Sequence, residues 1–396
     1  MINTTKPIYL DHSATTPVDQ RVADKLSEFM TSKYGNPSSI HSFGRDARNA
    51  MLSSRSIIAQ SLNCNPEEIY FTSGGTESDN MALLGYVRRN GNPGNRVIIS
   101  NIEHPAVKKS AEELERLGFE VVQVLSDSFG QVNPDDVLAE VNSQTILVSI
   151  MHVNNEVGTI NDISAIGREL RTKDIAFHTD AVQSFGKLPI DAQKMNIDML
   201  SLSSHKIYGP KGVGAIFIRS GIKLQPLLFG GRQEEGVRMG TENMSGIVGL
   251  AEAVSICQNE MISEAKYLTE LRDQLHTSIL NSVENVTLNG HPTDRLPGNL
   301  NLTFHGVEAE SLLMALDLEG IAVSSGSACS SGSTQPSGIL LSLGISEEDA
   351  QSSLRFTLGR SNTPEEISLT ADVVITTVKR LRKMSDREYS PTRRSA

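Results

Sequence analysis

SLSSHKIYGPKGVG, residues 201–214, is the stretch from which the rest of the chain is interpreted. An apolar run typical of a buried strand, residues 197–202, leads into it, and a second apolar run, residues 213–218, follows a Gly-Pro-Lys-Gly turn. This pattern predicts that Lys206 lies in a loop at a strand end, between two buried segments. A lysine amine in an apolar cleft loses proton affinity and becomes a nucleophile for carbonyls, including the aldehyde of pyridoxal phosphate. A solvated loop lysine is the commoner alternative, so the rest of the chain decides.

The composition is that of a globular protein large enough for more than one domain. The chain has 396 residues, of which 38% are apolar and 21% charged. Its net charge of −11 argues against a general nucleic-acid-binding surface. No apolar stretch is long enough to cross a bilayer and the first residues lack a signal or transit pattern, so we expect a cytoplasmic protein. Cys64, Cys257 and Cys329 stand far apart, so we expect neither a disulfide framework nor a metal site.

Apolar strands alternate with amphipathic helices over the first 220 residues. We expect strands near 68–72, 97–100, 119–125, 145–151, 175–180, 197–202 and 213–218, with helices near 22–30, 44–62, 81–89, 105–117 and 163–170. This alternation predicts an α/β fold with a mostly parallel sheet covered on both faces. In such sheets ligands bind beyond the carboxyl ends of the strands. Five candidate groups follow predicted strands at that edge: Thr76, His104, Asn155, Asp180 and Lys206.

The pattern changes after a long predicted helix, residues 245–280. Strands are expected at 299–304, 321–324 and 353–358, among helices at 309–318 and 364–384. We interpret this part as a smaller α+β domain that begins within the long helix. The last twelve residues, 385–396, are polar and are expected to be disordered.

The segment that follows the strand predicted at 68–72 has the composition of an anion site. Ser73-Gly74-Gly75-Thr76 joins a strand to a helix, and glycines let the backbone N–H groups of a helix start approach a phosphate closely. A plain strand-to-helix turn with Thr76 as N-cap is the alternative.

Other candidate groups suit the remaining needs of pyridoxal phosphate. Asp180 could pair with the pyridine nitrogen, Asn155 or Gln183 could meet the ring hydroxyl, and His104 could stack on the ring. Each also has an ordinary explanation, because Asp180 could be a loop-end or capping aspartate and His104 a structural histidine.

Cys329 and Arg355 add reactive and anion-binding candidates in the second half of the chain. Cys329 lies in a run of small and hydroxyl residues, 324–333, that we expect to be mobile and exposed, which suits a reactive thiol. Cys64 and Cys257 are expected to be small apolar packing residues. Arg355, on a predicted strand, could bind a carboxylate through a two-point fork or form a structural ion pair.

Ten motifs, in order, resemble those of one known family. They are YLDHSATTPV, GNPSSIHSFG, FTSGGTESDN, EHPAV, VNNEVGTI, HTDAVQSFGK, SSHKIYGPKGVGA, GTEN, SSGSACSSGS and LRFTLGRSNT. The chain resembles the cysteine desulfurases of the NifS/IscS type, within the class-V aminotransferases. The resemblance implies the fold type I of pyridoxal phosphate-dependent transferases, with a seven-stranded large domain (15–260), a small domain (1–14 and 261–384) and a homodimer.

The resemblance also implies a role for each candidate residue. Lys206 would hold the cofactor and act as the base, Asp180 would pair with the ring nitrogen, and His104 would stack on the ring and assist proton transfer. Asn155 and Gln183 would meet the ring hydroxyl region. The implied phosphate ligands are Gly75, Thr76, Ser203 and His205, with Thr241 of the partner subunit. Arg355, with the Asn155 region, would bind the substrate carboxylate, and Cys329 would accept the sulfur.

The implied reaction converts L-cysteine to alanine and leaves a persulfide on Cys329, which is passed to a sulfur acceptor such as an iron–sulfur scaffold. Three residues depart from the family pattern: His12, Arg232 and Met239. The last two concern the substrate entrance rather than the reaction class. A related selenocysteine lyase or transaminase, and a catalytically silent scaffold, are the alternatives. The presence of both Lys206 and Cys329 argues against the scaffold.

Overall fold

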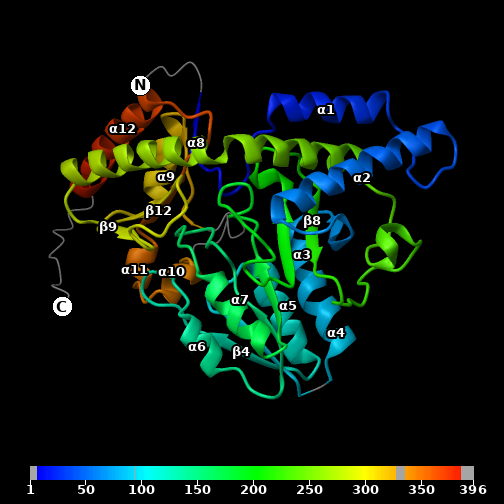
Figure 1. Ribbon diagram of the computed structural model, residues 1–396. Helices are drawn as coiled ribbons and strands as arrows, with labels where there is room; N and C mark the ends of the chain where they lie inside the picture. Colours follow the sequence, from blue (N-terminus) through cyan, green and yellow to red (C-terminus); the bar gives the residue numbers. More distant parts are fainter. Residues whose placement is uncertain (1–6, 93, 327–334, 385–396) are drawn as a thin grey trace.

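The computed structural model describes residues 7–92, 94–326 and 335–384 (Figure 1). Two sequence predictions, the reactive Cys329 and the tail at 385–396, therefore lie outside the described residues. Within the described residues, none of the helices combines the length and apolar character that crossing a bilayer requires.

A seven-stranded sheet forms the centre of the larger part of the molecule (Figure 1). Its strand order is β2-β8-β7-β6-β5-β3-β4, and β8 alone runs antiparallel to its neighbours. The mostly parallel sheet expected from the sequence is confirmed. The strands are β2 (Ile69–Thr72), β3 (Arg96–Ser100), β4 (Glu120–Val124), β5 (Thr145–Ser149), β6 (Ala176–Asp180), β7 (Met199–Ser203) and β8 (Gly214–Ile218).

Helices cover both faces of this sheet because neighbouring strand residues point to opposite faces. Ile98 packs in one apolar cluster with residues of α2 and α7, whereas Val97 and Ile99 pack in another with residues of α5. Strands buried on both faces are continuous apolar runs, which is why their positions could be predicted. The helices of this part are α1 (Gln20–Thr31), α2 (Ser42–Leu62), α5 (Pro105–Arg116), α6 (Pro134–Ala139) and α7 (Ile163–Thr172).

The helix after β2 begins six residues earlier than the predicted start at Met81. It comprises α3 (Gly75–Asn80), a π-helical turn (Met81–Gly85) and α4 (Tyr86–Asn90). Gly74, with φ 151° and ψ −174°, turns the chain directly from the strand into the helix, a conformation that only glycine adopts readily. The prediction was wrong here because the first helical turns carry polar residues that hide the apolar period, and Asp79 among them is buried.

The 39-residue helix α8 (Met244–Ser282) links the larger part to the smaller one (Figure 1). Leu250 and Val254, in its first half, pack in the same cluster as the large sheet, whereas Leu271 and Leu275, in its second half, pack against the small sheet. The small sheet is antiparallel, in the order β12-β10-β9. Its elements are β9 (Val286–Asn289), β10 (Asn299–Phe304) and β12 (Ser353–Thr357), with helices α9 (Ala309–Leu318) and α12 (Pro364–Met384).

Two chain segments cross between these parts. The N-terminal strand β1 (Ile8–Tyr9) pairs in parallel with β11 (Ile321–Ala322), which is shorter than the strand predicted at 321–324. In the other direction, α10 (Gly338–Ser342) and α11 (Glu347–Ala350) bury Ile339, Leu340 and Ala350 in a cluster of the larger part. We had not predicted β9, α6, α10 or α11, which are all short.

Candidate active site

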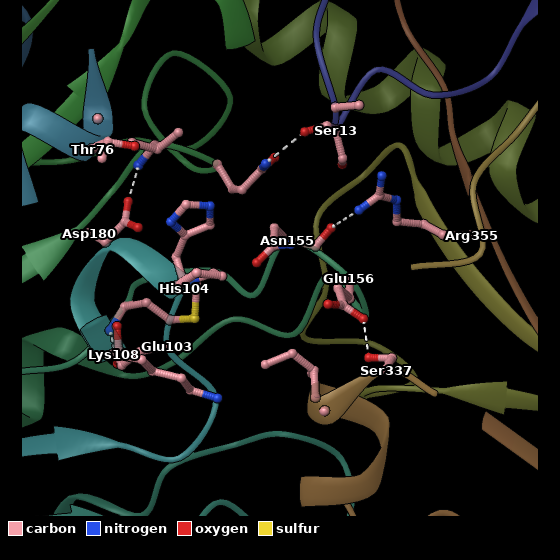
Figure 2. Close-up of a pocket in the computed structure, with 18 of the residues that line it drawn as sticks. Ser13, Thr76, Glu103, His104, Lys108, Asn155, Glu156, Asp180, Ser337 and Arg355 are labelled. Carbon is pink, nitrogen blue, oxygen red and sulfur yellow. Dashed lines mark hydrogen bonds between the residues drawn. The ribbon is translucent and has the colours of Figure 1, made fainter. Parts of the chain in front are cut away.

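A cavity of about 810 Å³ opens at the carboxyl ends of the parallel strands (Figure 2). Ten sequence-predicted residues line it: Gly75, Thr76, His104, Asn155, Asp180, Gln183, Ser203, His205, Lys206 and Arg355. For nine of them the common location follows from the topology of the large sheet, because its parallel strands end at one edge, whereas Arg355 comes from β12 of the small sheet. Thr241 does not line this cavity and is exposed on this chain, and Cys329 lies outside the described residues.

Lys206 ends a 3₁₀ turn (Ser204–Lys206) that directly follows β7. Its Nζ donates to the carbonyl oxygens of Ser13 and, at 2.8 Å, of Ala14. These two carbonyl acceptors hold the amine at the carboxyl end of β7, inside the cavity, where a lysine can react with a carbonyl group.

Asp180 ends β6 and is 5% exposed. Its Oδ1 accepts a hydrogen bond of 2.9 Å from the backbone N–H of Val182. Burial raises the pKa of Asp180, while His104, the Val182 N–H and Lys206 act to lower it. A buried carboxylate with no arginine partner in the described chain suits a cationic ligand group such as a protonated pyridine nitrogen.

His104 is the N-cap of α5, and its ring position is set by the helix end. Its Nδ1 accepts from the backbone N–H of Ala106 at 3.1 Å, which places the proton of a neutral imidazole on Nε2. Burial lowers the pKa of His104, so the neutral ring is favoured. Only Nε2 is therefore free to exchange a proton inside the cavity.

Gln183 offers an unused acceptor to the cavity. Its Nε2 donates to the Ser13 carbonyl at 3.0 Å, and its buried Oε1 has no hydrogen-bond partner among the described residues. An unpaired buried acceptor costs free energy, which a ligand hydroxyl would recover.

The helix start at Gly75 forms one end of the cavity. A β-carbon on Gly75 would lie 2.6 Å from Val182 Cγ2, so only glycine fits between the helix start and the loop after β6. Nearby, Nδ1 of His205 shares a hydrogen bond of 3.1 Å with the Thr15 hydroxyl, and burial lowers the pKa of His205 to about 4. Backbone N–H groups, a serine and a neutral histidine provide hydrogen-bond donors for a phosphate.

Arg355 forms the opposite wall, and both of its predicted alternatives have support. It is 1% exposed on β12, with Nη2 on Asp11 Oδ1 at 2.8 Å and Nη1 on the Asn155 carbonyl at 2.9 Å. The structural ion pair is therefore present. Its buried Nε has no partner among the described residues, so the guanidinium keeps one donor for a ligand.

The sequence reasoning missed other lining residues, among them Ser13, Asp79, Glu103, Lys108 and Glu156. Glu103 accepts from the Ser100 hydroxyl at 2.5 Å and from the Met151 N–H at 2.8 Å, and burial raises its pKa to about 8. The acids Asp79, Glu103 and Glu156 lie within three residues of the predicted site residues Thr76, His104 and Asn155. This closeness in sequence was the one signal that could have identified them as lining residues.

The residues present fit pyridoxal phosphate. One cavity contains a lysine amine, a buried carboxylate, an unpaired amide oxygen and a glycine-led helix start, which match the aldehyde, ring nitrogen, ring hydroxyl and phosphate respectively.

Comparisons with known proteins give the same assignment. The aminotransferase class-V family model matches residues 8–369. The chain is 46% identical over 380 residues to the cysteine desulfurase IscS of Dictyoglomus turgidum, covering 96% of each chain. It is 46% identical over 384 residues to that of Azotobacter vinelandii, covering 96% of this chain and 94% of the relative. A solved NifS-like protein superposes with a TM-score of 0.89 at 36% identity, covering 95% of this chain and 100% of the other. The chain therefore belongs to the aminotransferase class-V family and, within it, to the pyridoxal phosphate-dependent cysteine desulfurases of the IscS type.

Proposed function

We propose that this enzyme removes sulfur from L-cysteine with Lys206 as the cofactor lysine and base and with Cys329 as the sulfur acceptor. The observation that carries the proposal is the convergence of Lys206, Asp180 and Arg355 on one cavity from three distant segments. Bound pyridoxal phosphate supplies the electron sink that weakens the substrate C–S bond.

Each wall of the cavity has its own task in this proposal. Arg355 binds the substrate carboxylate, and the Asn155 carbonyl that it contacts keeps the guanidinium in place. Lys206 Nζ moves the α-proton, and Nε2 of His104 exchanges protons near the ring face. Asp180 faces the ring nitrogen, and Gln183 and Asn155 meet the ring hydroxyl region.

The phosphate lies at the helix start in this proposal. Its ligands are Gly75, Thr76, Ser203 and His205, and Thr241 of a second copy completes the site in a homodimer. The exposure of Thr241 on this chain is consistent with a partner contact.

The sulfur leaves by nucleophilic attack. The Cys329 thiolate attacks the substrate sulfur, so an S–S bond forms as the C–S bond breaks, and the bonding electrons pass to the carbon fragment that becomes alanine. The resulting persulfide is delivered to an acceptor protein of iron–sulfur assembly or thiolation. The names of the relatives support the sulfur chemistry, and the acceptor is part of our proposal.

We further propose a division into a large domain (15–260) and a small domain (1–14 and 261–384), and action in the cytoplasm. The packing of Ile8 and Leu10 with the small sheet supports the assignment of the N-terminal segment.

The deciding experiment measures alanine and sulfide release from L-cysteine by the parent protein and its Cys329→Ala variant. Cys64→Ala is the matched control, because Cys64 is half-buried and burial raises the pKa of its thiol to about 12. We expect the parent and the control to release both products and Cys329→Ala to release neither, while it keeps the visible cofactor band. Full alanine release by Cys329→Ala would contradict the assigned role.

A further inference from the structure

Three carboxyl side chains, Asp79, Glu103 and Asp180, line one wall of the cavity, although the proposed chemistry uses only Asp180. Asp79 is 1% exposed and Glu103 is fully buried. A carboxylate oxygen of Asp79, a carboxylate oxygen of Asp180 and a ring nitrogen of His104 all lie within 4.8 Å of one another. Carboxyl groups this close in a buried site do not both ionise, so one of the two aspartates carries a proton.

The surroundings of Asp79 do not compensate a negative charge. The nearest basic group is His178, whose Nε2 lies 3.7 Å from Asp79 Oδ1. Both ring nitrogens of His178 are shared with hydroxyls, of Ser149 at 2.8 Å and of Ser201 at 3.0 Å, and burial lowers its pKa to about 3. The imidazole is therefore neutral. Asp79 Oδ1 itself has no hydrogen-bond partner among the described residues.

The surroundings of Asp180 favour its charged form instead. It accepts the Val182 N–H, and His104 and Lys206 both act to lower its pKa. Burial first, and then Asp180, raise the pKa of Asp79 well above its usual value, with Glu103 acting in the same direction, and these effects outweigh the Ser201 side chain, which acts to lower it. These asymmetric surroundings assign the shared proton to Asp79.

We propose that Asp79 is a positioning residue that acts as a neutral carboxylic acid behind Asp180, so that the single negative charge of this pair rests on Asp180 and faces the cofactor ring nitrogen. The proposal rests on the proposed role of Asp180 and adds a group that does not itself touch the ring. A neutral polar neighbour stabilises the Asp180 charge by its dipole without competing for the ring's positive charge. An ionised neighbour would compete for that charge.

The protonation state is measured directly by infrared difference spectroscopy, whether or not the enzyme turns over. We expect the protein to show a C=O stretching band of protonated carboxyl groups at neutral pH, and Asp79→Asn to lose part of it. Asp198→Asn is the matched control, because Asp198 is as buried (4%) but is paired with Arg171 at 2.8 Å and Arg219 at 3.2 Å. An unchanged band in Asp79→Asn would overturn the proposal.

A pair of variants then separates positioning from packing. We expect Asp79→Leu, which removes the polar group, to lower kcat about tenfold with little change in KM and to shift the pH dependence of the visible cofactor band. Asp79→Asn keeps a neutral polar group and should restore both quantities to within about twofold of the parent. Equal losses in the two variants would mean that Asp79 acts through its charge, and a silent Asp79→Leu would mean that it only fills space. Either result contradicts the proposal.

Discussion

The two walls of the cavity hold their buried charges in opposite ways. On the small-sheet wall, which we call the matched wall, the Arg355 guanidinium is paired with the Asp11 carboxylate at 2.8 Å and with a backbone carbonyl. On the large-sheet wall, which we call the unmatched wall, Asp79, Glu103 and Asp180 are three carboxyl groups with no arginine partner in the described chain.

This difference shows on which wall the buried charges are already paired without a ligand. Burying an unpaired charge is costly, so a protein retains one only where a ligand compensates it or where the group stays neutral. In our proposal, the matched wall adds only a substrate carboxylate to an existing cation. The unmatched wall receives a positive group from outside, for which we propose the ring nitrogen of pyridoxal phosphate.

Replacing Lys206, which lines the same cavity, should have the largest effect. Lys206→Ala is expected to reduce alanine formation from L-cysteine by at least about 10³-fold, because the variant loses both the cofactor linkage and the base. Lys211→Ala, in the same loop but exposed, is the control and should retain parental activity. Multiple-turnover activity without the Lys206 amine would refute the assignment of this residue.

The second prediction tests the matched wall by keeping the positive charge at position 355 and removing the planar guanidinium group. Arg355→Lys is expected to raise KM for L-cysteine by roughly 10- to 100-fold with a smaller change in kcat, because a lysine cannot make the two-point contact. Arg295→Lys is the control, since Arg295 is also buried (5%) but donates to backbone carbonyls, among them those of Asn299 and Val157, and does not line the cavity. Both variants should lose stability, and only Arg355→Lys should change KM. An unchanged KM would leave Arg355 with the structural ion pair alone.

The sheet could be predicted from local signals, and so could Asp180 and His104, whereas Asp79 and Glu103 of the unmatched wall were missed. Strands buried on two faces are continuous apolar runs, and residues that follow parallel strands gather at one edge, which brought Asp180 and His104 together on topology alone. The helix start at Gly75 was misplaced because its first turns are polar.

Contacts between distant segments could not be predicted. Ser13 accepts from Lys206, 193 residues later in the chain, and Asp11 pairs with Arg355, 344 residues later. No local period or motif encodes such contacts, because they depend on how β1 packs beside β11. The roles of Cys329 and Thr241 remain predictions from the family resemblance.

A smaller effect on the unmatched wall concerns stability and pH. Burial raises the pKa of Glu103 to about 8, above the usual value of 4.5, so the folded state holds this proton more tightly than the unfolded state. The contribution of Glu103 to stability is therefore greatest below pH 4.5 and falls as pH rises towards about 8, by about 1.4 kcal/mol per pH unit.

Glu103→Gln should remove this slope when free energies of unfolding are measured by denaturant titration at several pH values between about 5.5 and about 8. Glu112→Gln, on the exposed side of α5, is the control and should keep the parental slope. A parental slope in Glu103→Gln would mean that Glu103 is ionised in the folded state.

The smallest effect expected concerns the one lysine that borders the unmatched wall from α5. Lys108 is half-buried and lines the cavity one helical turn after His104 (Figure 2). It makes no hydrogen bond or ion pair among the described residues. Its neighbour Lys109 is 74% exposed and pairs with Glu112. The Lys108 charge acts to lower the pKa of both Glu103 and Glu156. Removing it should raise both pKa values, because a carboxylate without a nearby cation is harder to form.

Stability should therefore continue to fall to a higher pH in Lys108→Met than in the parent. We expect the upper end of the range to rise by about half a pH unit, measured by the same denaturant titrations. Lys109→Met should leave that range unchanged, because solvent screens an exposed charge. Equal shifts in the two variants would mean that the unmatched wall responds to the net charge of α5 and not to a cation inside the cavity. A shift in Lys108→Met alone would show that this wall is partly compensated before the cofactor binds, and the contrast between the two walls would then be one of degree.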